Sequence, residues 1–231
     1  MKKCLICSNE FKPFVDFGNM PIANAFSTKK ELENEYFFPM QVGFCETCKM
    51  VQLLEQPDRE KMFHDSYAFF SSTSNYMINH FKKFANSVSS LQNLSKKSFV
   101  VEIGSNDGIM LQNFVSDNIP CLGVEPSKNV AHVAMERGIE VTTEFFDRPL
   151  AEKISRTHQK ADAILSANVM CHIPYMHSIF EGVKALLKND GVFIFEDPYL
   201  GEIIEKTSFD QIYDEHVFLF SALSVSHIAK M

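Results

Sequence analysis

Two closely spaced pairs of cysteines constrain the fold of this 231-residue chain most strongly. Cys4 and Cys7 form one C-x2-C pair, and Cys45 and Cys48 form the other. Each pair places two thiolates on one tight turn, and two such turns complete a tetrahedral site with four sulfur ligands. The second pair lies in VGFCETCKMVQL (residues 42–53), an apolar strand–knuckle–strand pattern typical of zinc ribbons. The spacing therefore predicts a structural Zn²⁺ ion with closed coordination.

Two other interpretations of these cysteines fit the spacing less well. Four unrelated buried cysteines rarely fall into two pairs at this spacing. A C-x-x-C redox motif follows a strand and opens a helix, and neither pair does so. We expect residues 1–60 to form a small zinc-binding module that depends on its metal for folding. Residues 61–97 are expected to form a helical connector, with a helix over residues 74–94 that begins at Ser74.

Strand-like and helix-like segments alternate from residue 98 onward. Expected strands cover residues 98–104, 120–126, 139–145, 161–169 and 191–198, and expected helices cover residues 108–117, 127–138 and 180–191. This alternation predicts a parallel sheet with helices on both faces. We therefore expect an α/β chain in which residues 98–231 form a Rossmann-like core.

A glycine loop follows the first expected strand. Residues 101–108 read VEIGSNDG, and Gly104 and Gly108 allow the backbone to turn sharply and to approach a ligand. The middle glycine of the dinucleotide fingerprint is missing, which disfavours an NAD-linked enzyme. S-adenosylmethionine (SAM) has no pyrophosphate, so polar side chains can meet its ammonium and carboxylate instead. The predicted contacts in this loop come from Glu102, Asn106 and Asp107, together with the two glycines.

Two further residues are predicted to bind the cofactor. Glu125 ends the second expected strand, where an acidic side chain can accept hydrogen bonds from both ribose hydroxyls. Asn168 follows the fourth expected strand, at the carboxyl edge of the sheet where ligands of such folds bind.

Composition excludes several classes of protein. The formal net charge is −7 and no block of Lys and Arg is present, which argues against nucleic-acid binding. No run of about 18 apolar residues exists to span a membrane. The first residues, MKKCLICSNEF, do not resemble a signal peptide, so we expect a cytoplasmic protein.

Four stretches together resemble a known family: the paired cysteines, YAFFSSTS (residues 67–74), VEIGSNDG, and FDQIYDEHVFLFS (residues 209–221). The resemblance is to zinc-containing, SAM-dependent C-methyltransferases that act on nucleotide-linked 4-keto-deoxysugars. It implies that the expected Rossmann-like core is of the class I methyltransferase type. It implies that a base removes the proton at sugar C3 and that the resulting enolate takes the methyl group of SAM. It also implies a small-molecule sugar-nucleotide substrate.

The resemblance assigns the catalytic candidates to two stretches. His216 matches the general base, Glu215 orients or polarises the site, and Tyr213 and Tyr67 donate hydrogen bonds or act as acids. The other histidines lack such neighbours and are expected to be surface or core residues, although His172 could border the cofactor.

The chain departs from the family pattern in three ways. Members commonly read YHEH where this chain has Asp214 in place of the first histidine. Members often carry a tyrosine shortly after, where this chain has Phe218-Leu-Phe. The strands that usually follow the fifth strand are missing, so we expect a truncated enzyme. The alternative function is a non-catalytic module that binds SAM or a sugar nucleotide.

Overall fold

The computed structural model describes residues 2–24, 26–63 and 67–230, which fold into two compact units. Unit 1 comprises Met1–Met62, Asn168–Met176 and Glu196–Met231, and unit 2 comprises Phe63–Ala167 and His177–Phe195. Unit 1 therefore collects three separate stretches of sequence, whereas the predicted domains follow the chain linearly. Among the described residues, no helix is long and apolar enough to cross a membrane.

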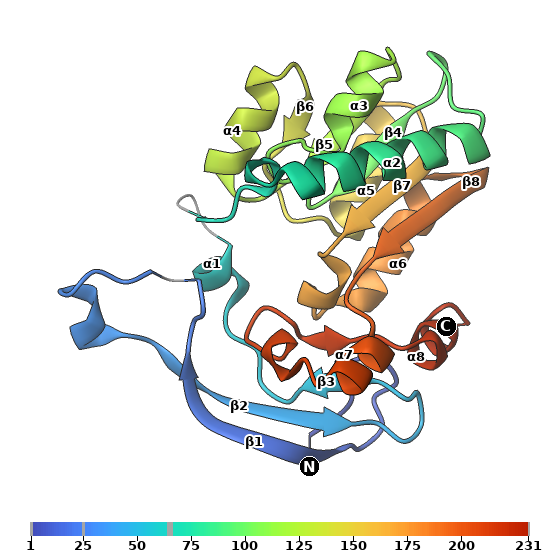
Figure 1. Ribbon diagram of the computed structural model, residues 1–231. Helices are drawn as coiled ribbons and strands as arrows, with labels where there is room; N and C mark the ends of the chain where they lie inside the picture. Colours follow the sequence, from blue (N-terminus) through green and yellow to red (C-terminus); the bar gives the residue numbers. More distant parts are fainter. Residues whose placement is uncertain (1, 25, 64–66, 231) are drawn as a thin grey trace. The chain divides into compact units, whose positions relative to one another are not determined.

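Unit 2 is built on a five-stranded sheet with strand order β6-β5-β4-β7-β8 (Figure 1). The strands are β4 (Val100–Ile103), β5 (Cys121–Val124), β6 (Glu140–Thr142), β7 (Ala161–Ala167) and β8 (Leu187–Glu196). Strand β4 pairs in parallel with both β5 and β7, and β5 pairs in parallel with β6. The chain thus winds outward from a central β4 in both directions, which confirms the predicted Rossmann-like fold.

The helices of unit 2 bury apolar stripes against this sheet. They are α2 (Asn75–Leu91), α3 (Leu111–Ser116), α4 (Lys128–Glu136), α5 (Arg148–Thr157) and α6 (Met176–Leu186). Helix α2 begins as predicted, because the Ser74 side chain accepts a hydrogen bond from the Met77 amide. Its buried face, Phe81, Ala85 and Val88, packs in one cluster with residues of α3, β4 and β7.

The boundary between α6 and β8 differs from the prediction. The expected helix runs to Gly191, but α6 ends at Leu186 and β8 begins at the next residue. Two contacts across the sheet hold this stretch extended. Lys188 donates to both carboxylate oxygens of Asp162 on β7 at 2.8 Å, and Gly191 lies so close to the Ala161 carbonyl that a Cβ would be 2.8 Å from it.

Unit 1 contains a four-stranded antiparallel sheet with the order β1-β2-β3-β9. Its strands are β1 (Lys12–Pro21), β2 (Phe37–Phe44), β3 (Val51–Leu53) and β9 (Phe218–Leu219). Alternate residues of β2, namely Phe38, Met40 and Val42, point into a core with residues of β3, β9 and α7. The strand–knuckle–strand pattern is confirmed, and β9 adds a strand from the far end of the sequence.

The remaining elements of the described chain are short. They are α1 (Arg59–Met62), α7 (Leu200–Lys206) and α8 (Ala222–Ile228), and the 3-10 helices η1 (Glu31–Asn34), η2 (Ser71–Thr73), η3 (Met170–His172) and η4 (Phe209–Gln211).

Candidate functional site

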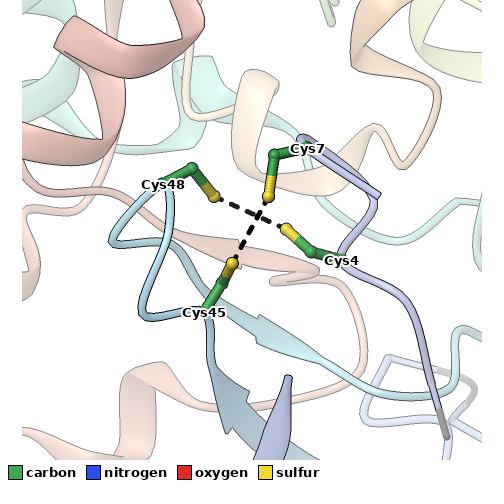
Figure 2. Close-up of side chains that lie close together, drawn as sticks. All are labelled: Cys4, Cys7, Cys45 and Cys48. Atoms are coloured by element: carbon green, nitrogen blue, oxygen red, sulfur yellow. Dashed lines mark hydrogen bonds between the residues drawn. The ribbon is translucent and has the colours of Figure 1, made fainter. Parts of the chain in front are cut away.

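The four paired cysteines converge on one point in unit 1 (Figure 2). The sulfur of Cys4 lies 3.5 Å from that of Cys48, and the sulfur of Cys7 lies 3.4 Å from that of Cys45. A tetrahedral zinc ion with Zn–S bonds of about 2.3 Å separates its sulfurs by roughly 3.8 Å. None of the four forms a disulfide bond, and the arrangement fits a closed Cys4 zinc site.

The two knuckles share one backbone geometry. In the first, the carbonyl of Cys4 accepts from the Ser8 amide at 2.9 Å; in the second, that of Cys45 accepts from the Lys49 amide at 2.8 Å. Ser8 and Lys49 each follow a pair directly, and both have left-handed backbones with φ near 60°. The turns therefore aim both thiols of each pair inward.

The chemistry of these thiols favours a bound cation. Burial raises the pKa of Cys4 to about 11 and also raises that of Cys48. Burial opposes ionisation of Cys7 too, but hydrogen bonds from Asn9 outweigh it and lower its pKa to about 7. Buried thiolates repel one another, and a divalent cation between them offsets that repulsion.

The glycine loop of unit 2 connects β4 to α3. Gly104, Asn106 and Gly108 all have positive φ, at 71°, 47° and 79°. The amide of Gly104 donates to the Val124 carbonyl at 2.8 Å, which holds the loop against the end of β5. The loop thus folds back over the carboxyl edge of the sheet, where this class of fold binds its ligands.

Two predicted acidic residues lie beneath this loop. One oxygen of Glu125 accepts from the Asn106 amide at 3.0 Å, and the other accepts from the Ser127 amide at 2.8 Å. Glu102 is buried in β4, and its Oε2 atom accepts no hydrogen bond within the described part of the chain. Burial, followed by the charges of Glu125 and Asp107, raises the pKa of Glu102. A buried carboxyl oxygen of this kind fits a cationic ligand group such as an ammonium.

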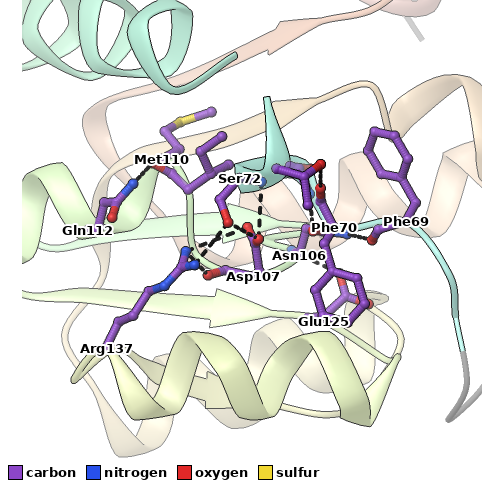
Figure 3. A network of polar contacts seen from close by, with 12 residues as sticks. Phe69, Phe70, Ser72, Asn106, Asp107, Met110, Gln112, Glu125 and Arg137 are labelled. Atoms are coloured by element: carbon purple, nitrogen blue, oxygen red, sulfur yellow. Dashed lines mark hydrogen bonds and ion pairs between the residues drawn. The ribbon is translucent and has the colours of Figure 1, made fainter. Parts of the chain in front are cut away.

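The side chains of Asn106 and Asp107 hold the segment at residues 69–72 (Figure 3). Asn106 accepts from the Ser71 amide and donates to the Phe69 carbonyl, both at 3.0 Å. Asp107 accepts from the Ser72 amide at 3.1 Å and from the Ser72 hydroxyl. Both side chains are thus hydrogen-bonded to residues 69–72. Their contact with a cofactor stays a prediction.

Arg137 completes this network, and sequence reasoning did not single it out. It donates to the Asp107 carbonyl at 2.7 Å and to the Ser72 hydroxyl at 2.9 Å. Asn129 of α4 adds a hydrogen bond to the carbonyl of Tyr67 at 2.7 Å. No local pattern marks Arg137, because it is an ordinary arginine at the end of a helix.

The YDEH stretch lies in unit 1 and is largely buried. Asp214 accepts from the Ala23 amide at 3.1 Å, and Glu215 accepts from the Asn24 side chain at 2.6 Å. Nδ1 of His216 lies 2.7 Å from the carbonyl oxygen of Gln211. A carbonyl only accepts, so Nδ1 carries the hydrogen, and Nε2 of the neutral ring keeps its lone pair.

The structure brings His172 to this cluster, which corrects the expectation that this histidine lacks such neighbours. The His172 ring stacks on the His216 ring, with centroids 5.2 Å apart. The centroid of the Tyr213 ring lies 4.3 Å from that of the His216 ring. Burial lowers the pKa of His216, and burial and the charge of His216 lower that of His172 to about 3. Burial also raises the pKa of Tyr213, so its hydroxyl stays protonated.

The two remaining predicted residues belong to different units. Tyr67 lies in unit 2, where its ring packs 5.5 Å from that of Phe63. Asn168 directly follows β7 but belongs to unit 1, with a left-handed backbone and an amide that donates to the Glu196 carbonyl at 2.7 Å. Their roles in catalysis and cofactor binding stay predictions.

Comparison with known proteins assigns both parts of the chain. Residues 4–63 match the family described as "Putative zinc binding domain", and residues 76–230 match the family described as "Methyltransferase domain". The chain therefore belongs to the methyltransferase domain family and carries a zinc-binding module with a Cys4 cluster. The predicted combination of SAM-binding core and zinc module is confirmed, and the NAD-linked alternative is set aside.

Among curated proteins, the chain is similar to the C-methyltransferase NovU of Streptomyces niveus. The two are 32% identical over 221 residues, which cover 95% of this chain and 52% of NovU. The chain thus spans about half the length of this relative.

Solved structures support the fold. The plantazolicin methyltransferase BpumL, in complex with SAH, matches with a TM-score of 0.51 at 17% identity, over 65% of this chain and 62% of BpumL. A SAM-dependent methyltransferase from Archaeoglobus fulgidus matches with a TM-score of 0.51 at 13% identity, over 68% and 73% of the two chains.

Proposed function

We propose that the chain is the cofactor-binding and base-bearing part of a C-methyltransferase that acts on a nucleotide-linked 4-keto-deoxysugar. The similarity to a C-methyltransferase over 95% of the chain supports the reaction class. The observation that carries the proposal is His216, a buried imidazole whose Nδ1 hydrogen bond leaves Nε2 to accept a proton.

The glycine loop and its acidic residues form the proposed SAM site. SAM supplies an electrophilic methyl group when bound. Glu125 is held by two amides at the end of β5, the position from which an acidic side chain reaches ribose hydroxyls. The buried Oε2 of Glu102 lies ready for a cationic group, as the ammonium of SAM would provide. Gly104 and Gly108 adopt left-handed backbones without the steric cost that a Cβ atom would bring.

The cluster around His216 supplies the proposed base. Because burial lowers its pKa, His216 stays neutral and able to take a proton at neutral pH. The C3 proton beside a ketone is far less acidic than imidazolium, so the enolate oxygen must be stabilised as it forms. The protonated hydroxyl of Tyr213 is suited to donate to it, and Glu215, fixed by Asn24, orients the site.

Cofactor binding is tested by calorimetry with SAM and SAH. Glu125→Ala removes a charged acceptor for two hydroxyls, and losing one such hydrogen bond costs roughly 1.5–3 kcal/mol. SAM affinity should fall at least about tenfold. Glu144→Ala, which removes an exposed carboxylate after β6, serves as the control and should bind normally. Equal affinity of Glu125→Ala and the parent would rule out the ribose contact.

Proton removal is tested separately from methyl transfer. The 4-keto sugar nucleotide is incubated with protein in heavy water, with SAH in place of SAM, and C3 is followed by NMR. His216→Asn should abolish exchange, whereas His227→Asn, an exposed histidine on α8, should not. Unchanged exchange in His216→Asn would mean that another residue is the base, with Tyr67 the next candidate. SAM binding without exchange in the parent would favour the alternative of a non-catalytic binding module.

A further inference from the structure

Cys171 lies close to His216 and has no role in the proposed reaction. Cys171 and His172 lie in η3, and one ligand atom from each of Cys171, His172 and His216 lies within 4.8 Å of the other two. One sulfur and two imidazole nitrogens are a donor set that suits zinc. In a tetrahedral site one sulfur and two nitrogens are roughly 3.3–3.6 Å apart, so small side-chain rotations close the set around an ion.

We propose that Cys171, His172 and His216 form a second zinc site, which is separate from the Cys4 cluster and is filled reversibly. It has three protein ligands, so a fourth position is left for water or another small ligand. The Cys4 cluster, by contrast, is closed by four thiolates. The second site should therefore bind zinc more weakly and exchange it more readily.

The orientation of His216 supports this assignment. Ligating histidines usually donate their other ring N–H to a carbonyl or carboxylate, which fixes the nitrogen that faces the metal. Nδ1 of His216 donates to the Gln211 carbonyl at 2.7 Å, so Nε2 is the nitrogen available to an ion. The stacked ring of His172, with planes only 26° apart, brings a second imidazole alongside it.

Asp197 supplies the negative charge that a buried cation needs. Its Oδ1 atom accepts from the Cys171 amide at 3.2 Å. Its Oδ2 atom is buried and accepts no hydrogen bond from any described residue. When zinc binds, the Cys171 S–H bond breaks, sulfur gives its electron pair to the metal, and the proton leaves to solvent. The net charge of the site rises by one, and the Asp197 carboxylate beside Cys171 offsets it.

Zinc at this site has a consequence that rests on the proposed function. The lone pair on Nε2 of His216 cannot bind a metal and accept a proton at the same time. A filled second site therefore blocks proton removal, and zinc acts as a reversible inhibitor.

The site is tested by metal binding alone, with the full chain carrying its first zinc equivalent. Calorimetric titration with Zn²⁺ should show a second, weaker equivalent. Cys171→Ser and His172→Gln should weaken it at least about tenfold while the first equivalent stays bound. Cys121→Ser, which alters a cysteine of unit 2, is the matched control and should keep both. Absence of the second equivalent, or its persistence in Cys171→Ser and His172→Gln, would overturn the proposal.

A spectroscopic measurement on the native chain guards against misfolded variants. Zinc outcompetes cobalt at a closed thiolate site, so added Co²⁺ enters only the second site. A thiolate-to-cobalt charge-transfer band should appear, and it should persist in Cys121→Ser. If no such band forms in the native chain, Cys171 is not a ligand and the site is refuted.

The exchange assay separates failure of the site from failure of the proposed base. Zinc should suppress exchange at C3 in the native chain and should do so less in Cys171→Ser. Binding of the second zinc with full exchange would reject His216 as the base and leave the metal site standing. If the chain binds no second zinc but exchange at C3 still depends on His216, the metal site is rejected and His216 remains the base.

Discussion

Gly108 should be the most sensitive position in the glycine loop, because alanine there violates two constraints at once. Its φ of +79° lies in the left-handed region that side chains with a Cβ avoid. A Cβ at this position would also overlap Cδ1 of Ile139 and lie 3.1 Å from Cβ of Ala134 in α4. Gly138 provides a matched control, since its φ is +80° but a Cβ there meets nothing within 4 Å.

The two variants separate backbone strain from steric overlap. Placing alanine in the left-handed region costs about 1–2 kcal/mol, and overpacking a core costs about 1–3 kcal/mol more. Gly138→Ala should therefore lose about 1–2 kcal/mol of the free energy of unfolding, and Gly108→Ala about 2–5 kcal/mol. Against a typical total of about 5–15 kcal/mol, the second loss should lower the melting temperature by roughly 10 °C.

Thermal and denaturant unfolding, followed by circular dichroism, measure both losses. Ile139→Val removes the overlapping Cδ1 atom, and alone it should cost about 0.5–1.5 kcal/mol. In the Gly108→Ala background, Ile139→Val should cost less than it does alone, or should restore stability. The difference gives a coupling energy of about 1 kcal/mol between the two positions. Equal losses in Gly108→Ala and Gly138→Ala, together with no coupling to Ile139, would refute the reasoning.

Three further predictions concern the metal, a buried acid and a helix cap. Cys45→Ser should lose the tightly bound zinc, and the antiparallel sheet of unit 1 should unfold while unit 2 keeps its parallel sheet. Metal analysis and hydrogen exchange measure these two effects. A variant that is folded and free of zinc would contradict this prediction. Burial raises the pKa of Glu102, so its neutral form stabilises the fold at low pH and that stability is lost as the pH rises. The melting temperature of Glu102→Gln should therefore rise relative to that of the parent as the pH increases above 4.5, the ordinary pKa of glutamate. A difference that does not change with pH would count against a buried, titrating Glu102. Asp147 caps α5 by accepting from the Leu150 amide at 2.9 Å, so Asp147→Ala should cost about 1 kcal/mol in denaturant unfolding, whereas Asp147→Asn should cost little.

The sequence determined the features that local spacing encodes. Two cysteines three positions apart must share a turn, so the four thiolate ligands of the zinc site follow from the spacing alone. The alternation of strands and helices from residue 98, with glycines directly after the first strand, likewise specified the parallel sheet and the place of the glycine loop. These signals need only neighbouring residues, because turn geometry and the burial of one face act over a few positions.

Tertiary structure decided what depends on partners far away in the chain. Phe218 and Leu219 become a strand because they pair with β3 near the other end of the sequence. Residues 187–190 carry a helical pattern, yet the ties from Lys188 and Gly191 to β7 draw them into β8. No local pattern predicts that His172 stacks on His216, which lies 44 positions later. Nor does one predict that the side chain of Asn106 binds the segment at residues 69–72. Such contacts form when the fold closes loops of many residues, and their energy appears only once the distant partners have met.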